Sequence, residues 1–175
     1  MNDQPMAAIA AWATFYTMVG SSAAALTGLM FVVIGMVMGW ARRRRSHDGL
    51  SVFSTPTVVH FGATLLVAAI LVAPWHSLAS PAVLVALSGL TGLAYMLRLI
   101  YRTRNLASYR ADLDDWAWYN ILPFVAYGAL CAGGFWALTS IEHALFVIAG
   151  AAVLLMFIGI RNAWDIVTYI AISEE

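Results

Sequence analysis

This 175-residue chain is too apolar for a water-soluble domain. Hydrophobic residues make up 62% of the sequence and charged residues 10%, at zero formal net charge and a mean hydropathy of +0.82, whereas soluble domains carry about 25% charged residues. The length allows one helical bundle and no second domain. The single cysteine, Cys131, excludes an internal disulfide and a cysteine-based metal site.

The N-terminal region predicts a first membrane span over residues 15–40. A run without charge extends from Gln4 to Ala41, which is far longer than the roughly 7–15 residues of a signal-peptide core. No basic residue precedes this run. We therefore expect a membrane helix rather than a cleavable signal.

One face of the first span is formed by small residues spaced by threes, fours and sevens. They are Ser21, Ala24, Gly28, Gly35 and Gly39. Small side chains let membrane helices approach closely, so this stripe predicts a helix contact. The contact lies either within one chain or between copies of it in a homo-oligomer, and the sequence leaves both interpretations open.

Four consecutive arginines, Arg42–Arg45, follow the first span. They predict a loop that binds anionic lipid head groups at about 1 kcal/mol per basic residue. No aromatic residues interleave the run, so we expect no nucleic-acid partner. Proline-containing helix start signals at residues 54–56 and 80–81 then open a second span over residues 57–75 and a third over 81–100.

Three aspartates, Asp112, Asp114 and Asp115, precede a fourth span over residues 118–140. Carboxylates at this place favour a helix N-terminus. Binding of magnesium and a phosphate is the enzymatic alternative, but the further carboxylates of diphosphate-binding sites are missing. No HExxH, GxSxG or Walker motif occurs, so an enzyme is the less favoured interpretation. A fifth span covers residues 144–164.

The arginines set the orientation of the five spans. All nine basic residues are arginines, and they lie at residues 42–45, 98–110 and 161. Five spans put them on one side of the membrane, which the positive-inside rule assigns to the cytoplasm, with the N-terminus outside and the C-terminus inside. Tryptophans fall at the span ends, where the membrane interface favours their rings. We therefore predict an all-α polytopic bundle of about five transmembrane helices, as one transmembrane domain over residues 1–175.

A polar layer is expected near the cytoplasmic boundary of this bundle. Its members are His60, Arg98, Asn120, Arg161, Asn162, Asp165 and Tyr169. Ionisable groups at such depth tend to face a bundle interior or a wet cavity and to pair, and histidine titrates near physiological pH. One interpretation is an inner vestibule that contacts an ion, proton or small anion. The other is a structural pair of Arg161 and Asp165, which share a helix face, with an arginine reaching toward the head groups.

A thinner polar group is expected on the outer side of the membrane. Its members are His76, Glu142 and His143. Two imidazoles and a carboxylate suit zinc or copper, but nothing in the sequence brings the two loops together, and ordinary interfacial residues are the alternative. Haem between two helices is not expected, because His60 and His76 lie at opposite ends of one span. We predict no cofactor, with an outer metal ion as the alternative.

Two segments resemble parts of known proteins. They are Thr-Pro-Thr-Val-Val-His-Phe at residues 55–61 and Asn-Ala-Trp-Asp-Ile-Val-Thr-Tyr at residues 162–169. Both are similar to segments of a family of small, uncharacterised bacterial inner-membrane proteins, and the likeness extends over most of the chain. The resemblance implies a bacterial inner membrane and no mechanism, and it draws attention to His60 and Asp165 within the two segments.

Three functions stay open on this basis. The leading hypothesis is a non-enzymatic homo-oligomer that forms or gates a permeation path for an ion or small solute, because a small-residue stripe accompanies a polar layer. The second is an accessory or regulatory subunit of a larger membrane complex, docked through the same stripe. The third is a metal-binding or redox membrane protein that uses His76 and His143, or the three aspartates.

Overall fold

The computed structural model describes residues 3–44, 50–104 and 116–172, with side chains over 4–35, 56–101 and 116–168. Within these ranges the chain folds into helices and contains no strand. The elements are α1 (Asp3–Ala11), α2 (Ala13–Arg44), α3 (Leu50–Val72), α4 (Ala79–Arg104), the π-helical turn η1 (Ala117–Ile121), α6 (Leu122–Ala137) and α7 (Ile141–Ile172). The prediction of an all-α bundle is confirmed.

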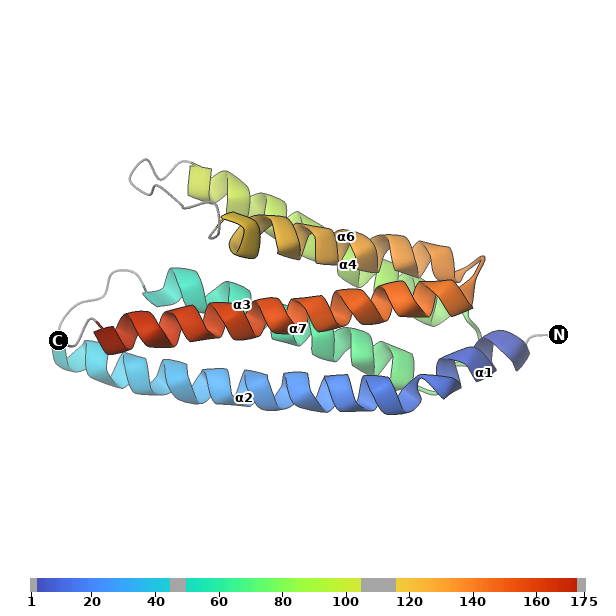
Figure 1. Cartoon of the computed structure of the whole chain (residues 1–175), viewed down its shortest axis with the longest axis horizontal. Helices are drawn as coiled ribbons and strands as arrows, with labels where there is room; N and C mark the ends of the chain where they lie inside the picture. Colours follow the sequence, from blue (N-terminus) through green and yellow to red (C-terminus); the bar gives the residue numbers. More distant parts are fainter. Residues whose placement is uncertain (1–2, 45–49, 105–115, 173–175) are drawn as a thin grey trace.

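The long helices run up and down along one common direction, so the two termini lie at opposite ends of the bundle (Figure 1). We call the end that holds α1 and residues 73–78 and 138–140 the N-terminal end. The C-terminal end is the opposite one, where α2, α4 and α7 finish and where α3 and η1 begin. Termini at opposite ends are what an odd number of membrane crossings produces.

Among the residues that the structure describes, four helical segments are long and apolar enough to cross a membrane. They are Ala13–Gly35, Ala79–Tyr101, Ala117–Ala137 and Ile141–Thr168. The remaining long helix, α3, contributes the shorter apolar segment Pro56–Val72. It ends three residues before the predicted boundary at residue 75, because Pro74 disfavours helical geometry at the residue before it.

The outer surface of the bundle is covered by large apolar side chains. Phe31 of α2, Phe135 of α6 and Phe146 of α7 are 63%, 61% and 68% exposed. Soluble monomers rarely expose large apolar patches, whereas such a surface suits the hydrocarbon of a bilayer. Together with the four spanning segments, it defines the chain as a multi-pass integral membrane protein.

Glycines bring α4 and α6 into backbone contact. A Cβ atom at Gly134 of α6 would lie 2.5 Å from the amide nitrogen of Ala86 and 2.7 Å from the carbonyl oxygen of Ala82. At Gly89 of α4, a Cβ would lie 2.7 Å from the carbonyl oxygen of Tyr127. The absence of side chains at these two glycines is therefore what allows the helices to pack so closely.

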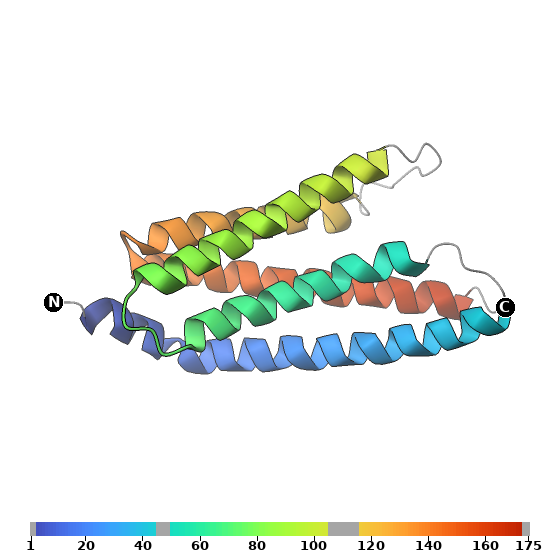
Figure 2. The ribbon, with the colours of Figure 1, turned by 180° about the vertical axis from the view of Figure 1, so that it is seen from behind.

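We divide the bundle into two helix groups by the divergence of α4 and α6 at one end (Figure 1), although α7 packs as extensively on α6 as on α3. The α2–α3–α7 group packs through contacts such as Gly20 of α2 against Ala68 of α3, and the α4–α6 pair forms the second group. The two are joined mainly through α6 and α7, where Gly133 lies against Ile148, and α4 has little contact with α3. Toward the C-terminal end, the α4–α6 pair diverges from the α2–α3–α7 group in both views (Figures 1 and 2).

Aromatic rings fasten α2 to α7 at the N-terminal end. The helix breaks at Trp12, between α1 and α2, and the Trp12 ring packs edge-on against Phe146 of α7 with a centroid distance of 4.7 Å. Edge-on aromatic pairs contribute about 0.5–1.5 kcal/mol beyond their area burial. The fully buried Tyr16 donates a hydrogen bond of 3.2 Å to the carbonyl oxygen of Leu145. These contacts set the start of α2 against the start of α7.

Candidate functional site

A histidine and a tyrosine form a buried pair between α3 and α6. His60 Nδ1 lies 2.9 Å from the Tyr127 hydroxyl oxygen, and each residue is 1% exposed. The Tyr127 ring lies over Gly92 of α4, where any Cβ atom would overlap it. Either group can be the donor, because a histidine ring nitrogen and a tyrosine hydroxyl can both donate and accept. The pair thus links the α2–α3–α7 group to the α4–α6 pair.

Two contacts fix the position of α3 along α7. Thr64 Oγ1 donates to the carbonyl oxygen of His60 in its own helix at 3.1 Å and lies 3.2 Å from the carbonyl oxygen of Ala152 in α7. Nearer the C-terminal end, a Cβ atom at Gly159 would come within 2.8 Å of the Phe61 ring. The missing side chain at Gly159 therefore lets Phe61 press against the α7 backbone.

Thr57 and Asn162 extend the polar region one turn further toward the C-terminal end. Thr57 precedes Phe61 by four residues and Asn162 follows Gly159 by three, so both share the helix faces of that contact. Both are 0% exposed, and within the described residues Thr57 Oγ1, Asn162 Oδ1 and Asn162 Nδ2 have no hydrogen-bond partner. Unpaired buried polar atoms are rare in proteins and call for an explanation. We call the group of four residues Thr57, His60, Tyr127 and Asn162 the polar centre.

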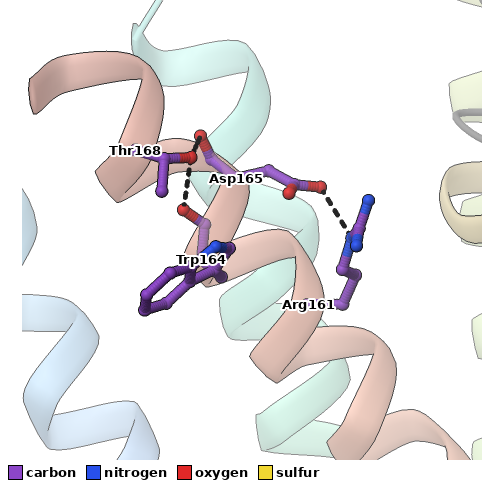
Figure 3. A network of polar contacts seen from close by, with 4 residues as sticks. All are labelled: Arg161, Trp164, Asp165 and Thr168. Atoms are coloured by element: carbon purple, nitrogen blue, oxygen red, sulfur yellow. Dashed lines mark hydrogen bonds and ion pairs between the residues drawn. The ribbon is translucent and has the colours of Figure 1, made fainter. Parts of the chain in front are cut away.

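Arg161 and Asp165 pair with each other at the surface of α7. Arg161 Nε lies 3.3 Å from Asp165 Oδ2, with side chains 47% and 30% exposed (Figure 3). The Arg161 guanidinium carbon also lies 5.8 Å from the ring centroid of Trp118 in η1. One turn further, Thr168 Oγ1 donates to the carbonyl oxygens of Trp164 and Asp165 at 3.0 and 3.1 Å (Figure 3). These groups satisfy one another, and an exposed pair of this kind contributes little to stability.

The other members of the predicted polar layer lie apart from the polar centre. Arg98 is exposed on α4, and Asn120 is half-buried in η1. The structure thus places His60 and Asn162 in the interior and the arginines at the surface. The predictions for Tyr169, Gly39, Arg42–Arg45 and Asp112–Asp115 concern side chains outside the described part of the chain.

Tyr127 and Thr57 belong to the polar centre but were not singled out from the sequence as site residues. A signal for Tyr127 does exist, because its hydroxyl lies in mid-span of an apolar helix and such a group must find a partner. The sequence predicts Thr57 to be the first residue of the second span, which hides its role, whereas α3 already begins at Leu50 and includes Pro56. Only the contact of Phe61 with Gly159 reveals that Thr57 lies on the face of α3 that packs against α7.

The small-residue stripe of α2 points away from the other described helices. Ser21, Ala24, Gly28 and Gly35 are exposed, and nothing described lies within 4 Å of a Cβ atom placed at Gly28 or Gly35. The helix contacts α3 and α7 through an adjacent face instead. The buried residues of that face are Tyr16, Val19, Gly20, Ala23 and Met30.

The outer polar residues are dispersed between the connection from α3 to α4 and the first turn of α7. His76 lines a pocket with Pro5, Met6, Ser77 and Leu78 near α1. His143 Nδ1 lies 2.9 Å from Ser140 Oγ, and its ring stacks on Trp136 with a centroid distance of 6.1 Å. Glu142, beside it, is exposed. Among the residues that the structure describes, no three His, Cys, Asp or Glu side chains gather in a way that could hold a metal ion.

The sequence matches no family model, no curated protein and no solved structure. The class of the protein therefore follows from its own fold and surface, which are those of an all-α, multi-pass integral membrane protein.

Proposed function

We propose that this membrane protein provides a gated permeation path for a proton or another small polar species, with the polar centre on that path. The observation that supports the proposal is the presence of four buried polar side chains from three helices inside a largely apolar bundle. Polar and ionisable groups are costly within a membrane and commonly mark ion, proton or substrate pathways.

An apolar layer closes the bundle between the polar centre and the N-terminal end. Its buried side chains include Val67, Val85, Leu130, Leu145 and Ile148. Hydrophobic constrictions in channels block conduction by excluding water, so this layer would act as the gate. Movement of the α4–α6 pair relative to the α2–α3–α7 group would open it, since both groups contribute side chains to the layer.

The hydrogen bond between His60 and Tyr127 crosses from one helix group to the other. In this proposal it therefore favours the closed arrangement. An interhelical hydrogen bond in a membrane protein contributes on average about 0.6 kcal/mol, which is a bias of about threefold toward the closed state. The polar pair thus acts as a latch, while the apolar layer is the barrier.

The test of this function is a flux measurement on Tyr127→Phe, which removes the hydroxyl and keeps the ring over Gly92. In proteoliposomes with an internal pH dye and a potassium diffusion potential, we expect proton influx to rise about threefold above that of the wild type. Tyr16→Phe is the matched control, because it also removes a buried hydroxyl, bonded to Leu145, but leaves the polar centre intact. Its proton influx should equal that of the wild type.

The same measurements can also contradict the proposal. Osmotic swelling in a urea gradient extends the same comparison to a neutral permeant. If wild type, Tyr127→Phe and protein-free liposomes gave the same proton influx and the same swelling rate, the protein would provide no path and the proposal would be wrong. Equal gains in Tyr127→Phe and Tyr16→Phe would reject the latch.

The orientation in this proposal follows the distribution of arginines. Helix α2 ends in arginines, and Arg98 and Arg161 lie toward the same C-terminal end of the bundle. The positive-inside rule then puts the C-terminal end in the cytoplasm. A bacterial inner membrane is the location that we propose.

A second function, an accessory subunit of a larger membrane complex, is favoured by the exposed small-residue stripe of α2. Faces of this kind admit another helix at close range. The same face could instead join copies of this chain into a homo-oligomer, which is compatible with the permeation path. Native mass spectrometry distinguishes the two, since it detects either identical copies or a different protein.

A further inference from the structure

Thr57 and Asn162 lie one turn beyond a contact of α3 with α7, on the helix faces that form it, and they do not bond to each other. Each lies one helical turn beyond the contact of Phe61 with Gly159, and each shares the face of its neighbour. Both side chains are 0% exposed, and their three polar atoms lack a partner in the part of the chain that the structure describes. Two facing helices thus present unused hydrogen-bonding groups at one level of the interface.

The chemistry of these atoms defines the kind of ligand they fit. The amide nitrogen of Asn162 donates, its oxygen accepts, and the hydroxyl of Thr57 does both. A metal cation would suit the two oxygens but would leave the amide nitrogen of Asn162 without an acceptor. An anion can only accept hydrogen bonds and would leave Asn162 Oδ1 unpaired. Exchange of the amide oxygen and nitrogen changes nothing here, because both atoms lack a described partner.

The charged residues next to this place do not supply a counter-charge for an ion. Arg161 adjoins Asn162 in the sequence, but its guanidinium points to Asp165 at the exposed face of α7 (Figure 3). A charge buried without a partner is far more costly than a neutral polar group. The ligand that satisfies both residues is therefore neutral.

We infer that Thr57 and Asn162 form a binding site for a small neutral molecule that both donates and accepts hydrogen bonds, either water or a solute of the amide or alcohol class. The site can bind this molecule whether or not the protein transports anything. That the bound molecule is also the permeant rests on the proposed function. Thr57 lies one turn from His60 on α3. The bound molecule is thus next to the latch formed by His60 and Tyr127.

Binding of water is tested by nuclear magnetic resonance on protein that carries nitrogen-15 only in its asparagines. The chain has four asparagines, and the signal that disappears in Asn162→Leu identifies the side-chain amide of Asn162. We expect this amide to show cross-relaxation with water protons in the wild type, although the side chain is fully buried, and to lose it in Thr57→Val. Thr27→Val is the matched control, because the Thr27 hydroxyl bonds within α2, to the carbonyl oxygen of Ala23 at 2.8 Å.

Transport of the bound molecule is tested by stopped-flow light scattering of proteoliposomes, with a sucrose gradient for water and a urea gradient for the solute. We expect Thr57→Val and Asn162→Leu to lose the permeability that the wild type and Thr27→Val add over protein-free liposomes. Loss of water permeability assigns the site to water, and loss of urea permeability alone assigns it to the solute class.

The outcomes separate this inference from the proposed function. An Asn162 amide without contact to water, together with water and urea permeabilities unaffected by both substitutions, would overturn the binding site. The proposed function would survive that result if Tyr127→Phe still raised proton influx. Conversely, an amide in contact with water and no flux of proton, water or urea would support the binding site and reject the permeation path.

Discussion

Hydroxyl groups of the helices form hydrogen bonds of two kinds. Those of Ser22, Thr27, Ser88, Thr91 and Thr168 donate to carbonyl oxygens three or four residues earlier in their own helix. Such bonds satisfy the hydroxyl group but do not connect one helix to another. The hydroxyls of Tyr16, Thr64 and Tyr127 instead reach a neighbouring helix. The hydrogen bonds of these three residues therefore help to determine which helices are neighbours, and their burial adds to this effect.

Replacement of Thr64 by valine isolates one such connection. Thr64→Val keeps the shape of the side chain but removes the contact of its hydroxyl with the Ala152 carbonyl in α7. We expect the free energy of unfolding to fall by about 0.6–1 kcal/mol, measured by denaturant titration in detergent micelles. Thr27→Val, which removes a bond within α2, should cost less. Equal losses in the two variants would contradict a role of Thr64 between helices.

The sequence can identify polar candidates at the residue scale but not their partners. The spacing of Arg161 and Asp165 by four residues is enough to put them on one helix face, and they form an ion pair. His60 and Tyr127, in contrast, are separated by 67 positions, so their contact depends on which helices are neighbours. Nothing in a single sequence states that α3 lies beside α6.

At the scale of helices, the start of α6 shows a local feature that the hydropathy pattern does not predict. The amide of Leu122 bonds to the carbonyl oxygen of Ala117, five residues back, which makes η1 a π-helical turn. Pro123 follows directly and has no amide hydrogen to continue a regular ladder. The wide turn lies where Trp118 meets the guanidinium of Arg161 in α7. The predicted span over residues 118–140 thus contains a distortion that hydropathy cannot detect.

The backbone contact of α4 with α6 can be tested with a single methyl group. In Gly134→Ala, the new Cβ would lie 2.5 Å from the Ala86 amide nitrogen, so the helices must separate, at a cost of about 1–3 kcal/mol. Gly128→Ala in the same helix is the control, because nothing described lies within 4 Å of its Cβ. That change should be neutral or should stabilise by up to about 1 kcal/mol, since alanine favours helix.

Unfolding in detergent, followed by circular dichroism, measures both variants. A Gly134→Ala protein as stable as the wild type would show that the α4–α6 contact relaxes easily and that the glycine is not required there.

Spacing of small residues is a weak guide to which helix face is buried. The stripe from Ser21 to Gly35 predicts a contact, yet its described members face away from the bundle. The contacts at Gly89, Gly92 and Gly134 involve residues that the spacing rule does not single out. In a chain rich in alanine and glycine, several faces satisfy the same spacing rule. The choice among them depends on the shapes of the partner helices, which a single sequence does not contain.

For the whole molecule, segregation of charge and length of apolar runs were sufficient to predict the architecture. Long apolar segments demand helices, because a membrane interior offers no water to backbone groups. The rule that arginines lie on one side then predicts an odd number of spans, and the termini do lie at opposite ends of the bundle (Figure 1). The division into two helix groups could not be predicted in this way. It results from glycine contacts and from hydrogen bonds between distant residues.

Substitutions in the exposed stripe of α2 test whether the protein assembles through this face. Leucine at both Gly28 and Gly35 would meet nothing described within 4 Å of either Cβ, so the subunit should fold and be at least as stable as the wild type. If another helix packs on this face, the double substitution should abolish that contact, because close approach requires small side chains. We therefore expect native mass spectrometry to show an assembly for the wild type and a monomer for the double variant. The control is Gly150→Leu, at an exposed and equally open glycine of α7. This control should assemble like the wild type. Survival of the assembly in the double variant would show that this face of α2 contacts only lipid. A monomeric wild type would mean that any permeation path is formed within a single subunit.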